Sequence, residues 1–312
     1  MTEFSQKIQT LLDEVSSVIV GQNDLKRDII VALLAGWHIL LEWAPGLAKT
    51  KTIQTFASAL DLNFQRIQFT PDLLPSDLIG AKIYDPDAKL FEVKKWPIFA
   101  NFVLADEINR APSKVQSALL ESMEERQVTI GETTFLLDTP FIVLATQNPL
   151  EQEGTFHLPE AQLDRFLLKT LVSYPSPKEE KEILLQTLTR ETQKIKRVFW
   201  KKDILVLQKE IEKVEVSESV YEYICRIIFA TRNTQKYTSI SYGASPRASL
   251  ALLKTSKVLA TMQGRDFVIP EDVKDMCYGV LRHRLILNYE ALADGISSED
   301  VITEILQDTQ IL

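Results

Sequence analysis

A Lys49-Thr50 pair stands between two stretches of regular pattern. Residues 38–42 form a short apolar run, and residues 51–60 carry apolar side chains at helical spacing. The order strand, tight loop, helix is the setting in which a loop binds phosphate, because backbone N–H groups at a helix start have no partner within the helix. There Lys49 would reach the outer phosphates and the Thr50 hydroxyl would ligate Mg²⁺. From this stretch alone, an ordinary turn with a chance Lys-Thr pair remains the alternative.

The loop departs at two positions from the phosphate-binding pattern G-x-x-x-x-G-K-[ST]. The pattern places glycine at positions 43 and 48, where this chain has Trp43 and Ala48. We expect Ala48 to be a helical residue that needs no positive φ, so this change should be easy to accept. Trp43 puts a bulky side chain where the backbone should come close to phosphate. Weak nucleotide binding therefore stays open as an alternative.

Adjacent carboxylates, Asp106 and Glu107, follow a second apolar run over residues 102–105. A buried parallel strand that ends at a metal site has this appearance. Asp106 would hold Mg²⁺ through water, and Glu107 would polarise a water that attacks a γ-phosphate. A third apolar run, over residues 141–145, leads to Asn148, whose amide would hold that water. Taken singly, each of these strand ends also fits an ordinary polar turn.

The composition limits the class of protein. The chain has 312 residues, enough for two domains, and a net charge of −8, which argues against nucleic-acid binding through bulk charge. A basic run over residues 194–202 surrounds Phe199 and Trp200, and we interpret it as a solvated face rather than a nucleic-acid contact. Neither a secretory signal nor a membrane span is visible, and Cys225 and Cys277 lack metal-site spacing, so we expect a cytoplasmic protein.

Strand and helix patterns alternate as far as residue 172, and after the proline-containing segment 174–177 the strand patterns nearly vanish. The sequence therefore predicts an α/β domain over residues 1–174 and a smaller all-α domain over residues 178–312. Two hairpins should project from the α/β domain, one over residues 81–93 and the other over residues 127–137.

Several stretches in a fixed order now point to a known family. They are residues 66–77, 97–101, 104–112, 145–149 and 243–248. On these stretches the chain resembles the MoxR family of AAA+ ATPases along nearly its whole length. The resemblance implies an α/β fold in which a parallel sheet, flanked by helices and carrying the phosphate-binding loop, forms the AAA+ core. It also implies that the smaller all-α domain is the AAA+ lid.

The resemblance assigns roles at the predicted strand ends. Lys49 and Thr50 match the Walker A motif, and Asp106 and Glu107 match Walker B. Asn148 matches the residue called sensor 1. The family, as this resemblance describes it, has glycine where this chain has Trp43, whereas alanine at position 48 agrees with the family.

Two arginines gain roles from the resemblance alone. Arg165 matches the arginine finger, which acts on the nucleotide of the neighbouring subunit, and Arg247 matches sensor 2, which reaches the γ-phosphate from the lid. Read without the family, both would be assigned to surface salt bridges. The remaining residues that the resemblance places around the nucleotide are Val20, Gly21 and Gln22 at the adenine, and Pro45, Gly46, Leu47, Ala48 and Lys51 in and beside the phosphate loop.

The resemblance implies a Mg²⁺-dependent ATPase that binds ATP and ADP and uses hydrolysis to remodel or mature a partner protein. The expected partner carries a von Willebrand factor A domain, and the expected assembly is a homo-oligomeric ring, with a hexamer as its size, because a finger that acts in trans needs a neighbour. The two hairpins would face the ring's pore or its partner.

Two alternatives stay open. A nucleotide-gated scaffold with weak or no turnover would follow if Trp43 blocks the phosphate loop. A DNA-directed motor and the ATPase subunit of magnesium chelatase share this fold; the charge balance disfavours the motor, and the quoted stretches disfavour the chelatase.

Overall fold

A parallel five-stranded sheet forms the centre of the computed structural model, which describes residues 2–43, 48–87, 89–148, 155–189 and 195–311. The strand order is β2-β5-β8-β1-β9, and every neighbouring pair runs parallel. The strands are β1 (Ile39–Trp43), β2 (Phe64–Gln68), β5 (Phe102–Asp106), β8 (Ile142–Gln147) and β9 (Leu168–Val172). Because all five run the same way, their carboxyl ends share one edge of the sheet and their amino ends share the other. The predicted α/β fold with a parallel sheet is confirmed.

The central strands β5 and β8 are nearly continuous apolar runs because helices cover both faces of the sheet. Successive side chains on a strand point to opposite faces, and the core divides accordingly. Leu41 and Leu104 belong to one buried cluster, whereas their neighbours Leu40 and Val103 belong to the other. The first cluster includes side chains of α1 (Thr2–Ser16), α2 (Asn23–Leu34) and α3 (Lys49–Ala59), and the second those of α4 (Pro75–Ile79) and α5 (Ser113–Glu125).

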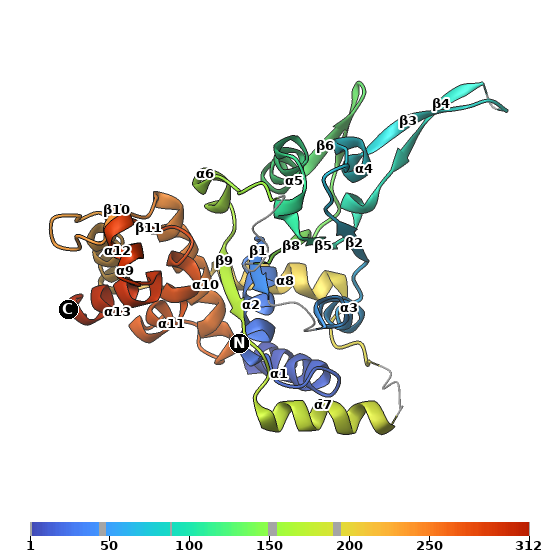
Figure 1. Cartoon of the computed structure of the whole chain (residues 1–312). Coiled ribbons are helices and arrows are strands. Elements are labelled where there is room, and N and C mark those ends of the chain that lie inside the picture. The colour runs from blue at the N-terminus through green and yellow to red at the C-terminus, as the bar shows by residue number, and fades with distance from the viewer. Residues whose placement is uncertain (1, 44–47, 88, 149–154, 190–194, 312) are drawn as a thin grey trace.

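Both predicted hairpins are present and extend from the same end of the α/β part (Figure 1). The longer one pairs β3 (Gly80–Asp85) with β4 (Leu90–Lys95), and the shorter one pairs β6 (Gln127–Ile130) with β7 (Thr133–Leu136). Gly80 begins the longer hairpin with φ 109°, and a Cβ there would lie 2.3 Å from the Lys94 carbonyl oxygen. Glycine is therefore required where this hairpin leaves the domain.

The chain after β9 is mostly helical; in Figure 1, α9 to α13 gather beside β9, whereas α7 lies next to α1 and α8 lies on the other side of β1. It contains α7 (Pro177–Thr189), α8 (Lys201–Glu212), α9 (Glu218–Thr231), α10 (Pro246–Met262), α11 (Pro270–Leu281), α12 (Tyr289–Ala293) and α13 (Ser298–Asp308). A small antiparallel pair, β10 (Ile240–Tyr242) and β11 (Ile286–Leu287), was not predicted. The elements that complete the chain are η1 (Pro97–Phe99), η2 (Ile108–Arg110) and α6 (Glu160–Leu163).

The segment around α8 packs back onto the α/β part. Phe199 is buried, Val198 N–H donates to the Ala59 carbonyl at 2.8 Å, and Gln208 Nε2 donates to the Leu33 carbonyl at 2.7 Å. The basic side chains here have partners in the same chain: Arg197 pairs with Asp61 and stacks on the Trp200 ring, and Lys201 pairs with Asp138. These contacts favour a structural role for the basic run.

One buried cluster extends from α1 to α13, so the α/β part and the helical part share a continuous core. The division of the chain near residues 174–178 stays a prediction. In the ranges that the structure describes, none of the helices combines the length and the apolar character that crossing a bilayer requires.

Candidate functional site

The carboxyl edge of the sheet brings together residues predicted from separate stretches. Lys49 is the first residue of α3, and its Nζ lies 3.2 Å from Oδ1 of Asp106 at the end of β5. Thr146, near the end of the neighbouring strand β8, donates its hydroxyl to the same Asp106 oxygen at 2.7 Å. Thr50 and Lys51 lie in the first turn of α3, with Thr50 half-buried and Lys51 exposed.

The Asp106 carboxylate is held in its charged form. Burial by itself would raise its pKa, but the Thr146 hydrogen bond, the Lys49 charge and the Arg66 hydrogen bonds together bring the pKa below its ordinary value. Asp106 is therefore ionised at neutral pH. Carboxylate and hydroxyl oxygens are the ligand types that Mg²⁺ takes, so Asp106 and Thr50 fit the predicted metal.

Two residues that the sequence analysis did not identify, Arg66 and Gln68, contact the carboxylates at this edge. Arg66 on β2 donates from Nη2 and Nε to Asp106 Oδ2, at 2.8 and 3.2 Å. Gln68, two residues further along β2, donates from Nε2 to Glu107 Oε2 at 2.9 Å. Arg66 and Gln68 are two residues apart on β2 and so share one face of the sheet, and the pairing of β2 with β5 brings them to the carboxylates.

Glu107 has an unusual backbone conformation, with φ 58° and ψ 50°. Left-handed backbone at a residue other than glycine costs on the order of 1 kcal/mol and is common at functional sites. The Glu107 N–H donates to the Thr146 hydroxyl at 2.9 Å, which helps to hold the turn. The Glu107 side chain then contacts Gln68 and pairs with Arg110, whose Nε lies 3.3 Å from Oε2. Asn148, one residue beyond β8, is buried at this same edge.

The expectation for Ala48 is wrong. Ala48 caps the start of α3 with φ 52° and ψ 31°, which is the left-handed region and not a helical conformation. The chain must turn sharply to enter α3, and the glycine of the usual pattern supplies that conformation without a Cβ. Alanine adopts it here at a cost of about 1 kcal/mol. Pro45, Gly46 and Leu47 lie outside the described residues, as does the side chain of Trp43.

The segment predicted to hold adenine enters α2 through two left-handed residues, Gly21 with φ 66° and Gln22 with φ 54°. A Cβ at position 21 would lie 2.3 Å from Oε1 of Glu179, a flexible side chain that can move aside, so the left-handed φ is what favours glycine here. Val20 precedes this turn and is half-buried. The predicted adenine residues are thus a tight turn between α1 and α2, with the first turn of α7 directly beside it.

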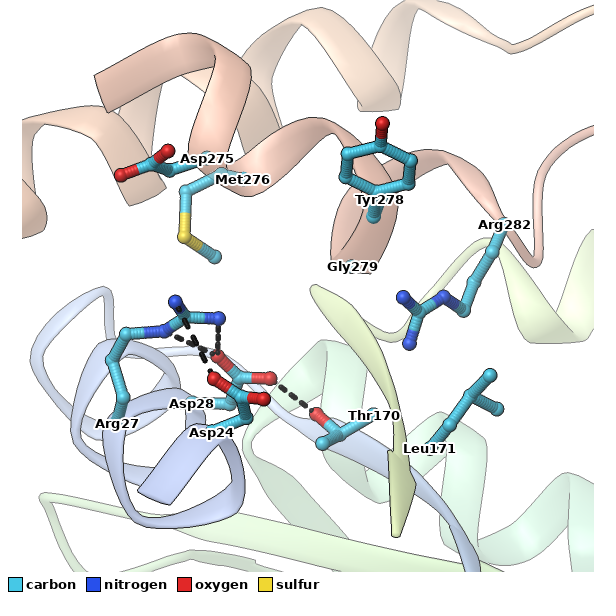
Figure 2. A pocket seen from close by; sticks show the side chains of 10 residues that line it. All are labelled: Asp24, Arg27, Asp28, Thr170, Leu171, Asp275, Met276, Tyr278, Gly279 and Arg282. Atoms are coloured by element: carbon cyan, nitrogen blue, oxygen red, sulfur yellow. Dashed lines mark hydrogen bonds and ion pairs between the residues drawn. The ribbon is translucent and has the colours of Figure 1, made fainter. Parts of the chain in front are cut away.

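A polar pocket of about 250 Å³ lies just past this turn, between α2, β9 and α11. Figure 2 shows Arg27 bridging Asp24 and Asp28, and Thr170 contacting Asp28. The Thr170 hydroxyl donates to Asp28 Oδ2 at 2.7 Å, and burial raises the pKa of the Asp28 carboxyl. The pocket joins the α/β part to the helical part next to the turn at Gly21 and Gln22.

Arg165 and Arg247 lie at the opposite edge of the sheet. Arg165 stands between α6 and β9, where the Leu167 N–H donates to the His38 carbonyl at the amino end of β1. Arg165 Nη1 lies 2.9 Å from one oxygen of Glu124, and Arg247 Nη2 lies 2.8 Å from the other. The two arginines therefore share one carboxylate near the end of α5.

The length of the strands separates these arginines from Lys49 and Asp106. A five-residue strand such as β1 spans roughly 16 Å at 3.3 Å per residue. Within one chain, the structure thus brings Arg165 and Arg247 to each other and not to Lys49 and Asp106. The γ-phosphate that the resemblance assigns to Arg247 would therefore belong to a neighbouring subunit, as for Arg165.

A buried ion pair fixes the segment that carries Arg165. Arg284, at the end of α11, is buried and donates from Nε to Asp164 Oδ1 at 2.7 Å. It also donates to the carbonyls of Phe166 and Leu167. Asp164 accepts a further bond from the Ser245 hydroxyl at 2.7 Å, just before α10. The helical part therefore holds the Arg165 segment through contacts to its backbone and to Asp164.

Comparison with known proteins agrees with this arrangement. The family model for the ATPase family associated with various cellular activities (AAA) matches residues 38–168, and the model for the AAA lid domain matches residues 232–305. The chain is similar to chaperone MoxR1 of Mycobacterium tuberculosis, with 48% identity over 96% of this chain and 81% of the relative. It is 44% identical to the Bacillus subtilis protein YeaC, over 96% and 93% of the two chains.

More distant and structural comparisons agree. The protein MoxR of Methylorubrum extorquens is 26% identical over 88% of this chain and 86% of its own. A crystal structure from Cytophaga hutchinsonii, of a protein assigned as an ATPase, superposes with a TM-score of 0.93 at 49% identity, covering 100% of this chain and 96% of that one. The family model, the close relatives and the fold lead to one assignment. The chain belongs to the MoxR family of AAA+ ATPases.

Proposed function

We propose that this protein is a Mg²⁺-dependent ATPase that works as a ring and remodels or matures a partner protein. The observation that supports hydrolysis best is the contact of Lys49 with Asp106 at 3.2 Å, directly beside Glu107. A phosphate-binding lysine, a metal-binding carboxylate and a second carboxylate held by Gln68 and Arg110 then lie within one cluster. This is the set that nucleotide hydrolysis needs.

Each residue has a task set by its place at this edge. Lys49 binds the outer phosphates, and Thr50 and Asp106 hold the metal, which supplies charge to neutralise the phosphates when it is bound. Glu107 accepts the proton of the attacking water, and Asn148 orients that water. Gly21 and Gln22 face the base, and the polar pocket between α2, β9 and α11, whose lining includes Asp24 just after Gln22, takes part in nucleoside binding.

The ring is proposed because the site residues lie at two opposite edges of the sheet. Arg165 and Arg247 lie at the amino edge with Glu124, whereas Lys49 and Asp106 lie at the carboxyl edge. We infer that the amino edge of one subunit faces the carboxyl edge of the next, so that both arginines reach a neighbour's γ-phosphate. A closed ring repeats this contact at every interface, and the family resemblance favours six subunits.

We infer the remodelling or maturation of a partner protein from the family and from the two hairpins. The relative named chaperone MoxR1 supports a chaperone-like role, and a von Willebrand factor A domain protein is the partner class we propose. Leu90 on the longer hairpin and Leu136 on the shorter one are 66% and 79% exposed, which suits a surface that grips another protein. The net charge of −8 favours a protein partner over nucleic acid, and we place the activity in the cytoplasm.

Steady-state ATP hydrolysis across a wide range of protein concentration tests the proposal, with Glu107→Gln as the matched inactive control. Specific activity should rise with concentration in the unmodified protein and stay near background in the variant. Activity in Glu107→Gln equal to that of the unmodified protein would exclude Glu107 from the reaction.

The scaffold alternative is tested by Trp43→Gly in the same assay. If the unmodified protein binds nucleotide without turnover and Trp43→Gly hydrolyses it, Trp43 inhibits the phosphate loop and the protein acts as a nucleotide-gated scaffold. Equal turnover in both proteins would show that the loop tolerates Trp43, and the scaffold reading would then be excluded.

A further inference from the structure

Trp37 lies at the amino edge of the sheet, in the short turn between α2 and β1. Its two neighbours in the chain tie this turn to the end of α5. Arg126 Nη2 donates to the Gly36 carbonyl at 2.5 Å, and His38 Nε2 lies 3.1 Å from the Met123 carbonyl. The backbone that carries Trp37 is therefore fixed to the helix that also carries the carboxylate shared by the two arginines.

The Trp37 side chain contacts two further segments of the chain. Its Nε1 donates to the Arg165 carbonyl at 2.7 Å. Its ring lies against the Lys254 ammonium, whose Nζ is 5.2 Å from the ring centroid, a distance at which a cation is attracted to an aromatic face. Lys254 follows Arg247 by seven residues on α10, about two helical turns, so the two side chains leave α10 from one face. A single side chain thus joins the backbone of Arg165 to the helix that carries Arg247.

These two contacts do not involve the guanidinium groups of the arginines. The guanidinium groups themselves pair with Glu124, and Arg165 Nη1 also donates to the Leu120 carbonyl at 3.0 Å. When phosphate oxygens of a neighbouring subunit replace Glu124, that carboxylate no longer directs the arginines. The contacts of Trp37 can persist in that state, because they are made by the Arg165 backbone and by Lys254. They leave the arginines less conformational freedom to lose when the side chains bind a phosphate.

We propose that Trp37 is a positioning residue that holds the Arg165 backbone and the Arg247 face of α10 in one geometry, so that both arginines reach the neighbouring subunit's nucleotide together. The inference rests on the proposed function, since it takes both arginines to act on a neighbour. It adds a specific location: the effect of Trp37 belongs to the neighbour's nucleotide site and not to the site of its own subunit.

Rings assembled from two inactive variants test this location. In a mixture of Arg165→Ala and Glu107→Gln subunits, the one complete interface joins the nucleotide site of an Arg165→Ala subunit to the Arg165 of a Glu107→Gln subunit. Trp37→Phe removes the N–H donor and keeps an aromatic ring for Lys254. It is introduced into one of the two subunits at a time, and steady-state ATP hydrolysis is measured at a protein concentration that saturates ring formation.

The subunit that carries the substitution should decide the result. Trp37→Phe in the Glu107→Gln subunit, which supplies the arginine, should lower the rate of the mixture roughly three- to tenfold, the size expected for loss of one hydrogen bond. The same substitution in the Arg165→Ala subunit, which supplies the nucleotide site, should leave the rate nearly unchanged. Equal falls in the two arrangements would mean that Trp37 acts through the stability or the nucleotide site of its own subunit, and would overturn the proposal. No fall in either arrangement would overturn it as well.

Trp200→Phe is the matched control, because Trp200 is 52% exposed and its ring stacks with Arg197 beside the start of α8. Placed in the Glu107→Gln subunit, it should leave the rate unchanged, and a fall equal to that of Trp37→Phe would remove the specific role of Trp37. If rings form but the mixture with unmodified Trp37 has no activity, the trans action in the proposed function fails. If that mixture is active and Trp37→Phe has no effect, only the role of Trp37 fails.

The contact with α10 has its own test. Lys254→Met in the Glu107→Gln subunit removes the cation from the Trp37 ring and should also lower the rate of the mixture. Lys254→Arg keeps a cation at the ring and should lower the rate less. An unchanged rate in Lys254→Met would show that α10 is not held through Trp37, and would overturn the joint positioning of Arg165 and Arg247.

Discussion

Lys49 and Arg165 lie at opposite edges of one parallel sheet. Lys49 follows the carboxyl end of β1, and Arg165 lies beside the amino end of β1, where Trp37 Nε1 donates to the Arg165 carbonyl at 2.7 Å. The intervening strand spans roughly 16 Å, and the two side chains contact different partners, Lys49 the Asp106 carboxylate and Arg165 the Glu124 carboxylate. A subunit alone therefore holds Lys49 and Asp106 at one edge and the two arginines at the other, which supports the proposal that the arginines act on a neighbour's nucleotide.

Mixing two inactive variants should restore hydrolysis. Arg165→Ala and Glu107→Gln should each lose activity, by about a thousandfold or more for the arginine, because a finger in trans stabilises charge in the transition state. In a mixed ring, an intact Glu107 in one subunit faces an intact Arg165 in the next. Steady-state hydrolysis of the mixture should exceed the sum of the two separate rates.

A double variant provides the control for this mixing experiment. Arg165→Ala combined with Glu107→Gln in one chain leaves no interface complete when it is mixed with Glu107→Gln, so this mixture should stay inactive. Recovery of activity there, or no recovery in the first mixture while rings form, would contradict action in trans.

Glu124 should restrain both arginines in the absence of a neighbour. Its carboxylate pairs with Arg165 and Arg247 and is 42% exposed, so the phosphates of an approaching subunit compete with it for the same guanidinium groups. Glu124→Gln should lower, by a fewfold, the protein concentration that gives half-maximal specific activity. The free energy of unfolding should change by less than about 1 kcal/mol, as for other exposed ion pairs.

The exposed neighbour Glu125 gives a matched control, and Glu125→Gln should leave the concentration dependence unchanged. Hydrolysis at saturating ATP across a protein dilution series provides the measurement. A fall in maximal activity at an unchanged half-maximal concentration would mean that Glu124 orients the arginines for the reaction instead of competing with phosphate.

Much of this fold could be predicted because its strands are strongly apolar and bounded by polar ends. The hairpins predicted over residues 81–93 and 127–137 are both present, and the carboxylates of Asp106 and Glu107 marked a strand end correctly. Local pattern was sufficient in these places, since the signal lies within a few neighbouring residues.

The rest depended on contacts between distant segments. Arg66 reaches Asp106 only because β2 pairs with β5, and Glu124 meets Arg165 and Arg247 only once three separate segments are packed together. The strands β10 and β11 are too short to produce a periodic signal. The error at Ala48 arose because the residue type suggested a helix, whereas the turn into α3 imposed a left-handed backbone.

Substitution of Arg284, which joins the sheet to the helical part, should lower the free energy of unfolding strongly. Its side chain is 1% exposed and pairs with Asp164, so Arg284→Met leaves a partly buried carboxylate and several carbonyls without their donor. The free energy of unfolding in urea should fall by about 3–5 kcal/mol. Lys236→Met, which removes an exposed pair with Asp308, should leave the free energy of unfolding nearly unchanged. Equal losses would contradict the special role of the buried pair.

His38 should make the fold sensitive to acid. The ring is buried; Nδ1 accepts from the Val143 N–H at 2.9 Å, and Nε2 lies 3.1 Å from the Met123 carbonyl. Burial is the main reason why the pKa of His38 falls from 6.5 to about 3; the hydrogen bond to the Met123 carbonyl opposes this shift, and the charge of Arg126 adds to it. The folded protein therefore takes up the proton less readily than the unfolded chain does.

The direction of the pH effect follows from that difference. Neutral His38 makes its full contribution to the free energy of unfolding above pH 6.5. This contribution is lost as the pH falls from 6.5 toward 3, at about 1.4 kcal/mol per pH unit once the histidine of the unfolded chain is charged. Urea unfolding at pH 7.5 and 5.0 should thus differ by about 2 kcal/mol more in the unmodified protein than in His38→Asn. Asparagine can still accept from Val143 but does not titrate, and the other buried groups, including His283, are the same in both proteins. Equal pH dependence in the two proteins would mean that His38 is not held neutral by the fold.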